Sequence, residues 1–175
     1  MLITGRPGCG KTTLLREVVD ALGTPAGGFY TRELRDGSGR RAGFELVTLD
    51  GRTATLAHTG TGGPHRVGRY GVDIEALERA GVPAIEAAVE AGQLVVIDEI
   101  GKMELLSTAF QRAVIAAVRR YRVLFGTVML AAHPFADELK AQPDTLLFEL
   151  NEANRAQLRG LLEAQLRAAL GQLSV

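Results

Sequence analysis

Apolar positions along the chain alternate between short runs typical of strands and longer stretches with helical spacing. A short strand-like segment, residues 1–4, precedes a glycine-rich stretch, and leucines and valines then recur at helical spacing over residues 11–22. Helical spacing returns over residues 74–80 and, after Pro83, through about residue 91. Further helices are predicted at about 108–121, 134–141 and 152–170, and further strands at 94–98, 123–128 and 146–150. Strands that alternate with helices predict an α/β fold with a parallel sheet and helices on both faces.

Residues 28–57 carry a different pattern, in which β-prone segments are separated by short turns. The strand-like stretches cover residues 28–34, 44–49 and 53–56, with turn signals at 36–39 and at Asp50-Gly51. Consecutive strands joined by such short turns pair antiparallel, because parallel pairing needs a long crossover. The segment therefore predicts an antiparallel meander, inserted after the first helix and followed by a loop over residues 58–72.

Composition narrows the class of protein. We expect residues 1–175 to form one domain, since no linker divides them and the length suits a single core. No apolar run is long enough to span a membrane and no signal-peptide pattern is visible, so we expect a cytoplasmic protein. Cys9 is the only cysteine, so we expect no internal disulfide and no disulfide-linked partner. A formal net charge of zero argues against a protein that binds the nucleic-acid backbone.

The most informative motif is residues 5–12, whose sequence fits G-x-x-x-x-G-K-[ST]. It lies between a strand-like and a helical segment, which is the context that a phosphate-binding loop requires. Its glycines let the backbone curl around phosphate oxygens, and the N-terminus of the following helix favours anions. We expect Lys11 to place its ammonium at the β- and γ-phosphates of a nucleoside triphosphate, and Thr12 to offer its hydroxyl to Mg²⁺.

The apolar strand at 94–98 ends in two adjacent carboxylates, Asp98 and Glu99. Ligands of open α/β sheets lie at the carboxyl ends of the strands, so both acids are expected at the same edge as the phosphate loop. We predict that Asp98 holds Mg²⁺ and that Glu99 activates a water for attack on the γ-phosphorus. Because neighbouring side chains on a strand point in opposite directions, the two carboxylates are expected to perform different tasks.

The residues that follow Asp98 continue in a pattern more specific than an acidic strand end. Residues 95–105, together with 5–13, 28–33 and 67–73, resemble the small P-loop nucleoside-triphosphatases, a family that includes a cancer-related enzyme of animals and thermophile-type enzymes of microbes. The resemblance covers nearly the whole chain. It implies the P-loop NTPase fold, a three-layer sandwich with a mostly parallel sheet into which the meander is inserted. It also implies that the strand at 123–128 lies between the phosphate-loop strand and the Asp98 strand.

The resemblance implies a Mg²⁺-dependent enzyme that hydrolyses several nucleoside triphosphates to the diphosphate and phosphate. The nucleotide-binding residues would be Gly5, Arg6, Pro7, Gly8, Cys9, Gly10, Lys11, Thr12, Thr13, Val95, Val96, Ile97, Asp98, Glu99, Ile100, Gly101 and Lys102. Within this set, Glu99 and Lys11 would be catalytic, and Thr12 and Asp98 would hold the metal. Two positions depart from the family pattern, since Cys9 stands where a small aliphatic residue is expected and Arg69 where lysine is more usual.

Arg66 and Arg69 flank Gly68 in the predicted loop at 58–72. They could close over the triphosphate as arginine fingers and stabilise transition-state charge, or they could belong to a solvated surface. Lys102 and Glu104 follow the acid pair, where they could form an ion pair that orders the loop, or Lys102 could reach a phosphate.

Other residues at the predicted nucleotide-binding edge of the sheet allow two interpretations each. His133 follows one strand, and Asn154 and Arg155 follow another, so any of them could border the nucleobase. Turn formation and helix capping explain the same residues.

Two functions other than hydrolysis use the same phosphate loop. A nucleotide or small-molecule kinase has a similar size, although the Asp98-Glu99 pair favours the activation of water. A nucleotide-dependent RNA-binding module could use the arginine-rich meander, although zero net charge weighs against it.

Overall fold

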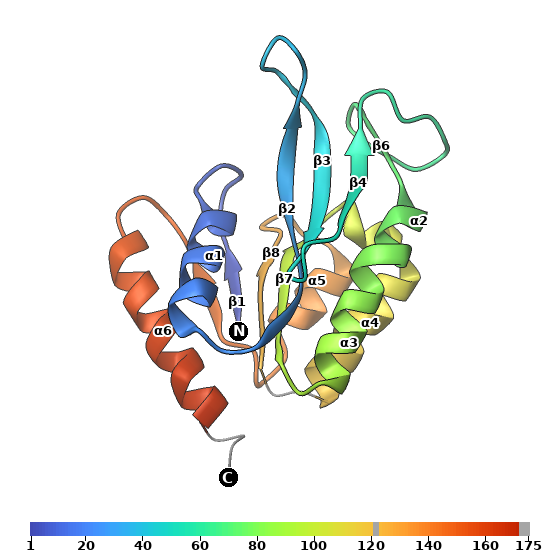
Figure 1. Cartoon of the computed structure of the whole chain (residues 1–175). Helices are drawn as coiled ribbons and strands as arrows, with labels where there is room; N and C mark the ends of the chain where they lie inside the picture. Colours follow the sequence, from blue (N-terminus) through green and yellow to red (C-terminus); the bar gives the residue numbers. More distant parts are fainter. Residues whose placement is uncertain (121–122, 172–175) are drawn as a thin grey trace.

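Nine strands form one sheet in the part of the chain that the computed structural model describes, residues 1–120 and 123–171 (Figure 1). The strands are β1 (Leu2–Thr4), β2 (Ala26–Arg35), β3 (Arg41–Thr48), β4 (Thr53–His58), β5 (Arg66–Val67), β6 (Tyr70–Val72), β7 (Leu94–Ile100), β8 (Leu124–Val128) and β9 (Leu147–Glu149). Their order across the sheet is β5-β6-β4-β3-β2-β7-β8-β1-β9. We call β7, β8, β1 and β9 the parallel half, because each pairs parallel with its neighbours, and β2 to β6 the antiparallel half.

Strand β2 joins the two halves. It pairs parallel with β7 along one edge and antiparallel with β3 along the other. The predicted meander is therefore built directly onto the parallel sheet. Strand β8 lies between β1 and β7, which confirms the strand order predicted from the resemblance.

Helices cover both faces of the parallel half, as the alternating pattern predicts. They are α1 (Lys11–Leu22), α3 (Val82–Glu90), α4 (Thr108–Arg120), α5 (Pro134–Lys140) and α6 (Arg155–Gly171). One core contains α1 and α6 side chains, and the other contains those of α3, α4 and α5. Along β7 successive residues alternate between these cores: Val95 and Ile97 face the α3–α4 side, and Val96 faces α1. The predicted three-layer sandwich is confirmed.

The antiparallel half contains more strands than predicted. Two further strands, β5 and β6, lie within residues 58–72, where we predicted only a loop, and β6 pairs with β4 through Ala57 and Val72. Strands of two and three residues among glycines and arginines are too short to produce a periodic pattern. The β2–β3 hairpin projects from the top of the molecule in Figure 1.

Residues 74–90 form one continuous helical run instead of two helices separated before Pro83. The run begins with α2 (Ile74–Ala76), where the Asp73 carboxylate accepts a hydrogen bond of 2.8 Å from the Ala76 N–H. A π-helical turn over Leu77–Gly81 then leads directly into α3, whose first turn contains Pro83. The Val82 N–H bonds to the Leu77 carbonyl in the π-helical turn, so the hydrogen-bond pattern changes just before Pro83, which has no N–H to donate, and the run continues through it.

Other boundaries differ from the prediction by a few residues. Helix α6 begins at Arg155 instead of Glu152, because the Asn151 side chain accepts hydrogen bonds from the Ala153 and Asn154 N–H groups and forms a turn there. Strand β7 continues two residues past Asp98. The predicted end of α4 at Tyr121 lies outside the described residues. Among the helices that are described, none is both long and apolar enough to span a bilayer.

Candidate active site

The phosphate-loop motif forms the predicted connection between a strand and a helix. Strand β1 ends at Thr4 and α1 begins at Lys11, with the glycine-rich segment between them. The Lys11 ammonium folds back over this segment and donates to the carbonyl oxygens of Gly5 (3.2 Å) and Arg6 (3.5 Å). The loop thus presents the N-terminus of a twelve-residue helix and one cation at the same edge of the sheet.

Asp98 connects the phosphate loop to two strands. Its carboxylate accepts hydrogen bonds from the hydroxyls of Thr12 (2.7 Å) and of Thr127 on β8 (2.5 Å). The side chain is buried, and burial raises the pKa of Asp98, while the two threonine hydroxyls and Lys11 act in the opposite direction. Thr127 was not predicted as a site residue, although its position follows from placing β8 beside β7.

Glu99 lies beside Lys11, with 3.5 Å between its Oε1 and the Lys11 Nζ. Burial raises the pKa of Glu99; Lys11 lowers it and Asp98 raises it further. Regular alternation along β7 would direct Asp98 and Glu99 to opposite sides of the strand. In the structure both carboxylates contact residues of the phosphate-loop motif, Thr12 and Lys11. The pairing of β7 with β8 shifts register in this segment, between Ile97 and Ile100. The peptide bond between the two acids is cis.

A cavity of about 560 Å³ opens beside Lys11 and Glu99, and we call it the Glu99 cavity. Both halves of the sheet line it. The lining residues from the parallel half and its loops are Gly5, Pro7, Lys11, Glu99, Gly101, Lys102, Met103, Glu104, Met129, Leu130 and Ala131, and those from the antiparallel half are Thr31, Phe44, Leu56 and Val67. The residues predicted at the nucleotide site thus form one end of a larger chamber.

The remaining predicted nucleotide-site residues fall into two groups, one exposed and one buried. Arg6, Gly8 and Thr13 are exposed on the phosphate loop and the first turn of α1. The β7 residues Val95, Val96, Ile97 and Ile100 are instead buried in the two hydrophobic cores. Their side chains fix the strand that carries the acids.

Glu104 is a third acid of the site, and its environment differs from the prediction. Its side chain is buried and Lys102 is exposed, and no ion pair joins them among the described residues. A methyl group placed on Gly101 would lie 3.1 Å from Glu104 Oε2 and 3.3 Å from Glu99 Oε2, so the two carboxyl groups flank this glycine. Burial raises the pKa of Glu104 to about 8, and the charges of Glu99 and Asp98 add to the effect. At neutral pH Glu104 is therefore mostly protonated.

Arg155, at the start of α6, holds the phosphate loop from outside. Its guanidinium donates to the Gly10 carbonyl (3.2 Å) and to Glu17 on α1 (2.9 Å). Gly10 has a φ of +91°, and a methyl group there would lie 2.9 Å from the guanidinium. Sequence reasoning proposed Arg155 only as a possible neighbour of the nucleobase; a contact between residues so far apart in the chain leaves no local pattern.

Arg66 and Arg69 lie on the β5–β6 hairpin, and their guanidinium groups are engaged there. Arg66 donates to the Arg69 carbonyl (2.9 Å), and Arg69 donates to the Arg41 carbonyl and packs over the ring of Tyr70. Neither arginine lines the Glu99 cavity, although Val67 between them does. Their assignment as arginine fingers stays a prediction.

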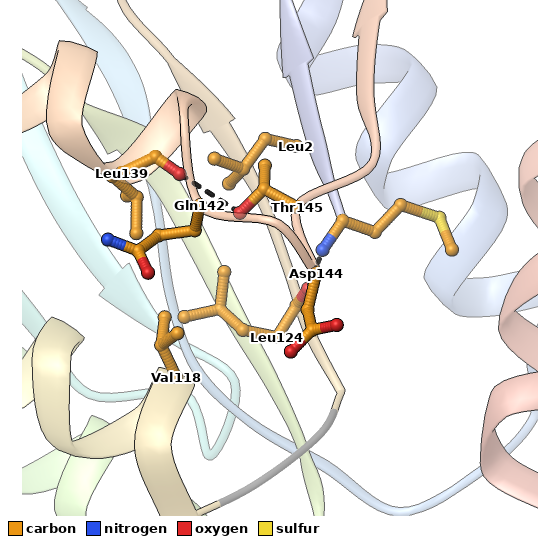
Figure 2. Close-up of a pocket in the computed structure, with 8 residues that line it drawn as sticks. Leu2, Val118, Leu124, Leu139, Gln142, Asp144 and Thr145 are labelled. Carbon is orange, nitrogen blue, oxygen red and sulfur yellow. Dashed lines mark hydrogen bonds between the residues drawn. The ribbon is translucent and has the colours of Figure 1, made fainter.

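A second cavity, of about 480 Å³, lies at the opposite edge of the sheet (Figure 2). Leu2 and Leu124 line it at the amino ends of β1 and β8, whereas the phosphate loop follows the carboxyl end of β1. The Thr145 hydroxyl donates to the Leu139 carbonyl inside it (2.9 Å). Asp144 and the Met1 amino group, which donates to the Leu124 carbonyl (2.7 Å), both belong to its lining, and none of the predicted site residues does.

Comparison with known proteins was consistent with this geometry. A family model described as NTPase matches residues 1–162. The chain is 44% identical over 158 residues to the nucleoside-triphosphatase THEP1 of Thermotoga maritima, covering 90% of both chains. It is 39% identical over 178 aligned positions to the human cancer-related nucleoside-triphosphatase, covering 90% of this chain and 91% of the human one.

Solved structures give the same result for the fold. The crystal structure of THEP1 from Aquifex aeolicus superimposes with a TM-score of 0.87 at 33% identity, covering 95% of this chain and 98% of that one. The solution structure of a human cancer-related nucleoside triphosphatase gives a TM-score of 0.81 at 32% identity, covering 97% of each chain.

Proposed function

Because the chain belongs to the NTPase family and is a nucleoside-triphosphatase, we propose that it releases the γ-phosphate of its substrate with Mg²⁺, using the phosphate loop and the acids of β7. We assign the residues from one observation: two residues of the phosphate-loop motif contact the two acids of β7 at one edge of the sheet. Thr12 lies 2.7 Å from Asp98, and Lys11 lies 3.5 Å from Glu99.

The phosphate loop would bind the triphosphate through its backbone N–H groups and Lys11. The N-terminus of α1 carries partial positive charge, and the Lys11 side chain is largely shielded from solvent. An ammonium in such a site acts more strongly on developing negative charge than it would in water. We therefore assign Lys11 to the stabilisation of charge on the β- and γ-phosphates.

The oxygen atoms of Thr12 and Asp98 fit Mg²⁺. A hydroxyl and a carboxylate are hard ligands of the kind that Mg²⁺ prefers, and Mg²⁺ is usually held by one or two protein groups together with substrate phosphates and water. Bound there, Mg²⁺ would supply neutralisation of phosphate charge. Thr127, by donating to the other oxygen of the Asp98 carboxylate, fixes the orientation of that side chain.

Glu99 would accept the proton of the attacking water. Its carboxylate lines the cavity next to Lys11, so a water held between Glu99 and the γ-phosphate can lose a proton to it as the oxygen attacks phosphorus. Glu104, being mostly protonated at neutral pH, adds little third negative charge beside the triphosphate. A charged group there would repel the substrate.

The test is phosphate release from ATP, GTP, CTP and UTP by the wild type, by Glu99→Gln and by the control Glu33→Gln. Glu33 lies on β2, where it pairs with Arg35 on the surface. Loss of the general base should lower kcat by about 10²–10⁴-fold while nucleotide binding persists. Unchanged hydrolysis by Glu99→Gln would show that another group activates the water.

A further inference from the structure

We propose that the Glu99 cavity is an acceptor site for a small alcohol with an apolar body, to which the protein transfers the γ-phosphoryl group. The proposal rests on the proposed function, because it uses the same phosphate loop and the same base. It adds a second substrate to a site that also hydrolyses triphosphates.

The size of the cavity is the first argument. Its volume of about 560 Å³ falls in the range of small-molecule sites, roughly 300–1,000 Å³. One attacking water occupies only about 30 Å³. A terminal phosphoryl group and its water would fill the end at Lys11 and Glu99 and leave the rest of the chamber for another molecule.

The distribution of polar and apolar groups is the second argument. Lys11, Glu99 and Glu104 lie at the phosphate end. The rest of the wall is mainly apolar, with Phe44, Leu56 and Val67 from the antiparallel half and Met103, Met129 and Leu130 from the loops after β7 and β8. An apolar wall with polar groups at one end suits a molecule whose reactive group is polar and whose body is not.

The kinds of side chain in the wall are a third argument. Two of the six are methionines, which fit irregular apolar ligands because they are unbranched and polarizable. Leu130 is 46% exposed, an apolar side chain left in contact with solvent beside the cavity. An entering apolar molecule would cover it.

The chemistry uses the groups already assigned. The alcohol oxygen forms a bond to the γ-phosphorus as the bond from that phosphorus to the β–γ bridging oxygen breaks. The bridging oxygen leaves with the electron pair on the nucleoside diphosphate, and Glu99 takes the hydroxyl proton. The products are a phosphate monoester and the diphosphate; when water takes the place of the alcohol, the products are phosphate and the diphosphate.

The experiment measures ADP, phosphate and phosphate monoester from ATP and Mg²⁺ in the presence of benzyl alcohol, 1-hexanol or glycerol at equal concentrations. We expect benzyl alcohol and 1-hexanol to divert phosphoryl groups from water to ester, and glycerol to do so much less, because it has no apolar body. The matched variants are Ala131→Trp, which fills the cavity from its rim, and Ala132→Trp, whose exposed alanine does not line the cavity. Ala131→Trp should lower the ratio of ester to phosphate by about tenfold or more, and Ala132→Trp should leave it unchanged.

The outcomes separate this inference from the proposed function. Release of ADP and phosphate at the normal rate with no ester from any alcohol would overturn the acceptor site and leave the hydrolase intact. An ester whose yield is equally affected by both tryptophans would also overturn it, because transfer would then not depend on this cavity. Absence of ADP release under all conditions would overturn the proposed function itself.

Discussion

The two halves of the sheet contribute to the active site in different ways. In the parallel half, β1, β7 and β8 run in the same direction, so residues at and beyond their carboxyl ends meet at one edge and bring Thr12, Asp98 and Thr127 into hydrogen-bond contact. The strands of the antiparallel half run alternately and share no common end. They contribute Phe44, Leu56 and Val67, which line the cavity from strand faces and a hairpin. The polar groups of the parallel half are therefore positioned by strand topology, and the apolar groups of the antiparallel half by packing.

The first prediction compares the loss of a cation from each half of the sheet by its effect on kcat. Lys11→Met should lower kcat by about 10²–10³-fold, because it removes a charge directed at the phosphates. Arg41→Met removes an arginine of β3 that forms a surface ion pair with Glu33, and should change kcat only slightly. Steady-state phosphate release measures both. Equal losses would mean that the antiparallel half also supplies essential charge.

The second prediction breaks the junction between the halves. Gly28 on β2 has a φ of +110°, and a methyl group there would lie 2.0 Å from the Val96 carbonyl oxygen on β7. Gly28→Ala should lower the free energy of unfolding by more than about 3 kcal/mol. Gly39→Ala, at a φ of +80° with open space around it, should cost about 1–2 kcal/mol. Urea denaturation measures both values, and similar losses would show that the close approach of β2 to β7 is unimportant.

The third prediction concerns the proton on Glu104. The folded protein keeps this proton up to about pH 8, whereas the unfolded chain releases it near the ordinary value of 4.5. Between these values the folded state binds more protons, so the stability that Glu104 contributes is complete below the lower pH and is lost as the pH rises to the upper one. Glu104→Gln carries no such proton.

Urea denaturation of the wild type and Glu104→Gln across this interval is the measurement. The difference in unfolding free energy, wild type minus variant, should decline as the pH rises, by at most about 1.4 kcal/mol per pH unit. Asp98 and Glu99 are present in both proteins, and while Glu104 holds its proton they face a neutral side chain in both, so their own titration largely cancels in the difference. Parallel curves would show that Glu104 loses its proton at an ordinary pH.

The smallest effect is expected for Arg155, which contacts the phosphate loop from outside the site. Arg155→Ala removes the hydrogen bond to the Gly10 carbonyl and should weaken nucleotide binding by about three- to tenfold. Arg159→Ala is the matched control, because Arg159 also pairs with Glu17 but, within residues 1–120 and 123–171, forms no hydrogen bond or ion pair with the loop. Equilibrium binding of ATP measures both. Equal effects would assign the result to the charge of Glu17 and not to the loop.

The sequence predicted the parts of the site that topology determines. The phosphate-loop motif, the acids that end β7 and the place of β8 all follow from strand–helix alternation and the family resemblance. It placed Asp98 and Glu99 at the same edge as the phosphate loop, but it did not predict the register shift of β7 against β8, which cannot be read from β7 alone. It also missed the burial of Glu104, because only the folded loop after β7 encloses that carboxyl group.

The prediction was weakest for the antiparallel half, for related reasons. Strands β5 and β6 are too short to give a pattern. The apolar wall to which β5 contributes combines residues from five separate segments. Pro83 suggested a helix start, but the π-helical turn before it keeps the helix continuous. Local sequence patterns predict single helices and strands well, whereas contacts between segments distant in the chain can be seen only in the folded structure.

The hydrogen bond between Arg155 and Gly10 also has a consequence for the order in which the protein matures during translation. The phosphate loop is synthesised before its outer support, which lies 145 residues later in the chain. Strand β1, which leads into the loop, is likewise flanked by β8 and β9, which are synthesised late. At about 5–20 residues per second, roughly 7–30 s separate the synthesis of the loop from that of Arg155. A nascent chain therefore carries the nucleotide-binding motif well before it can hold that motif in its final shape.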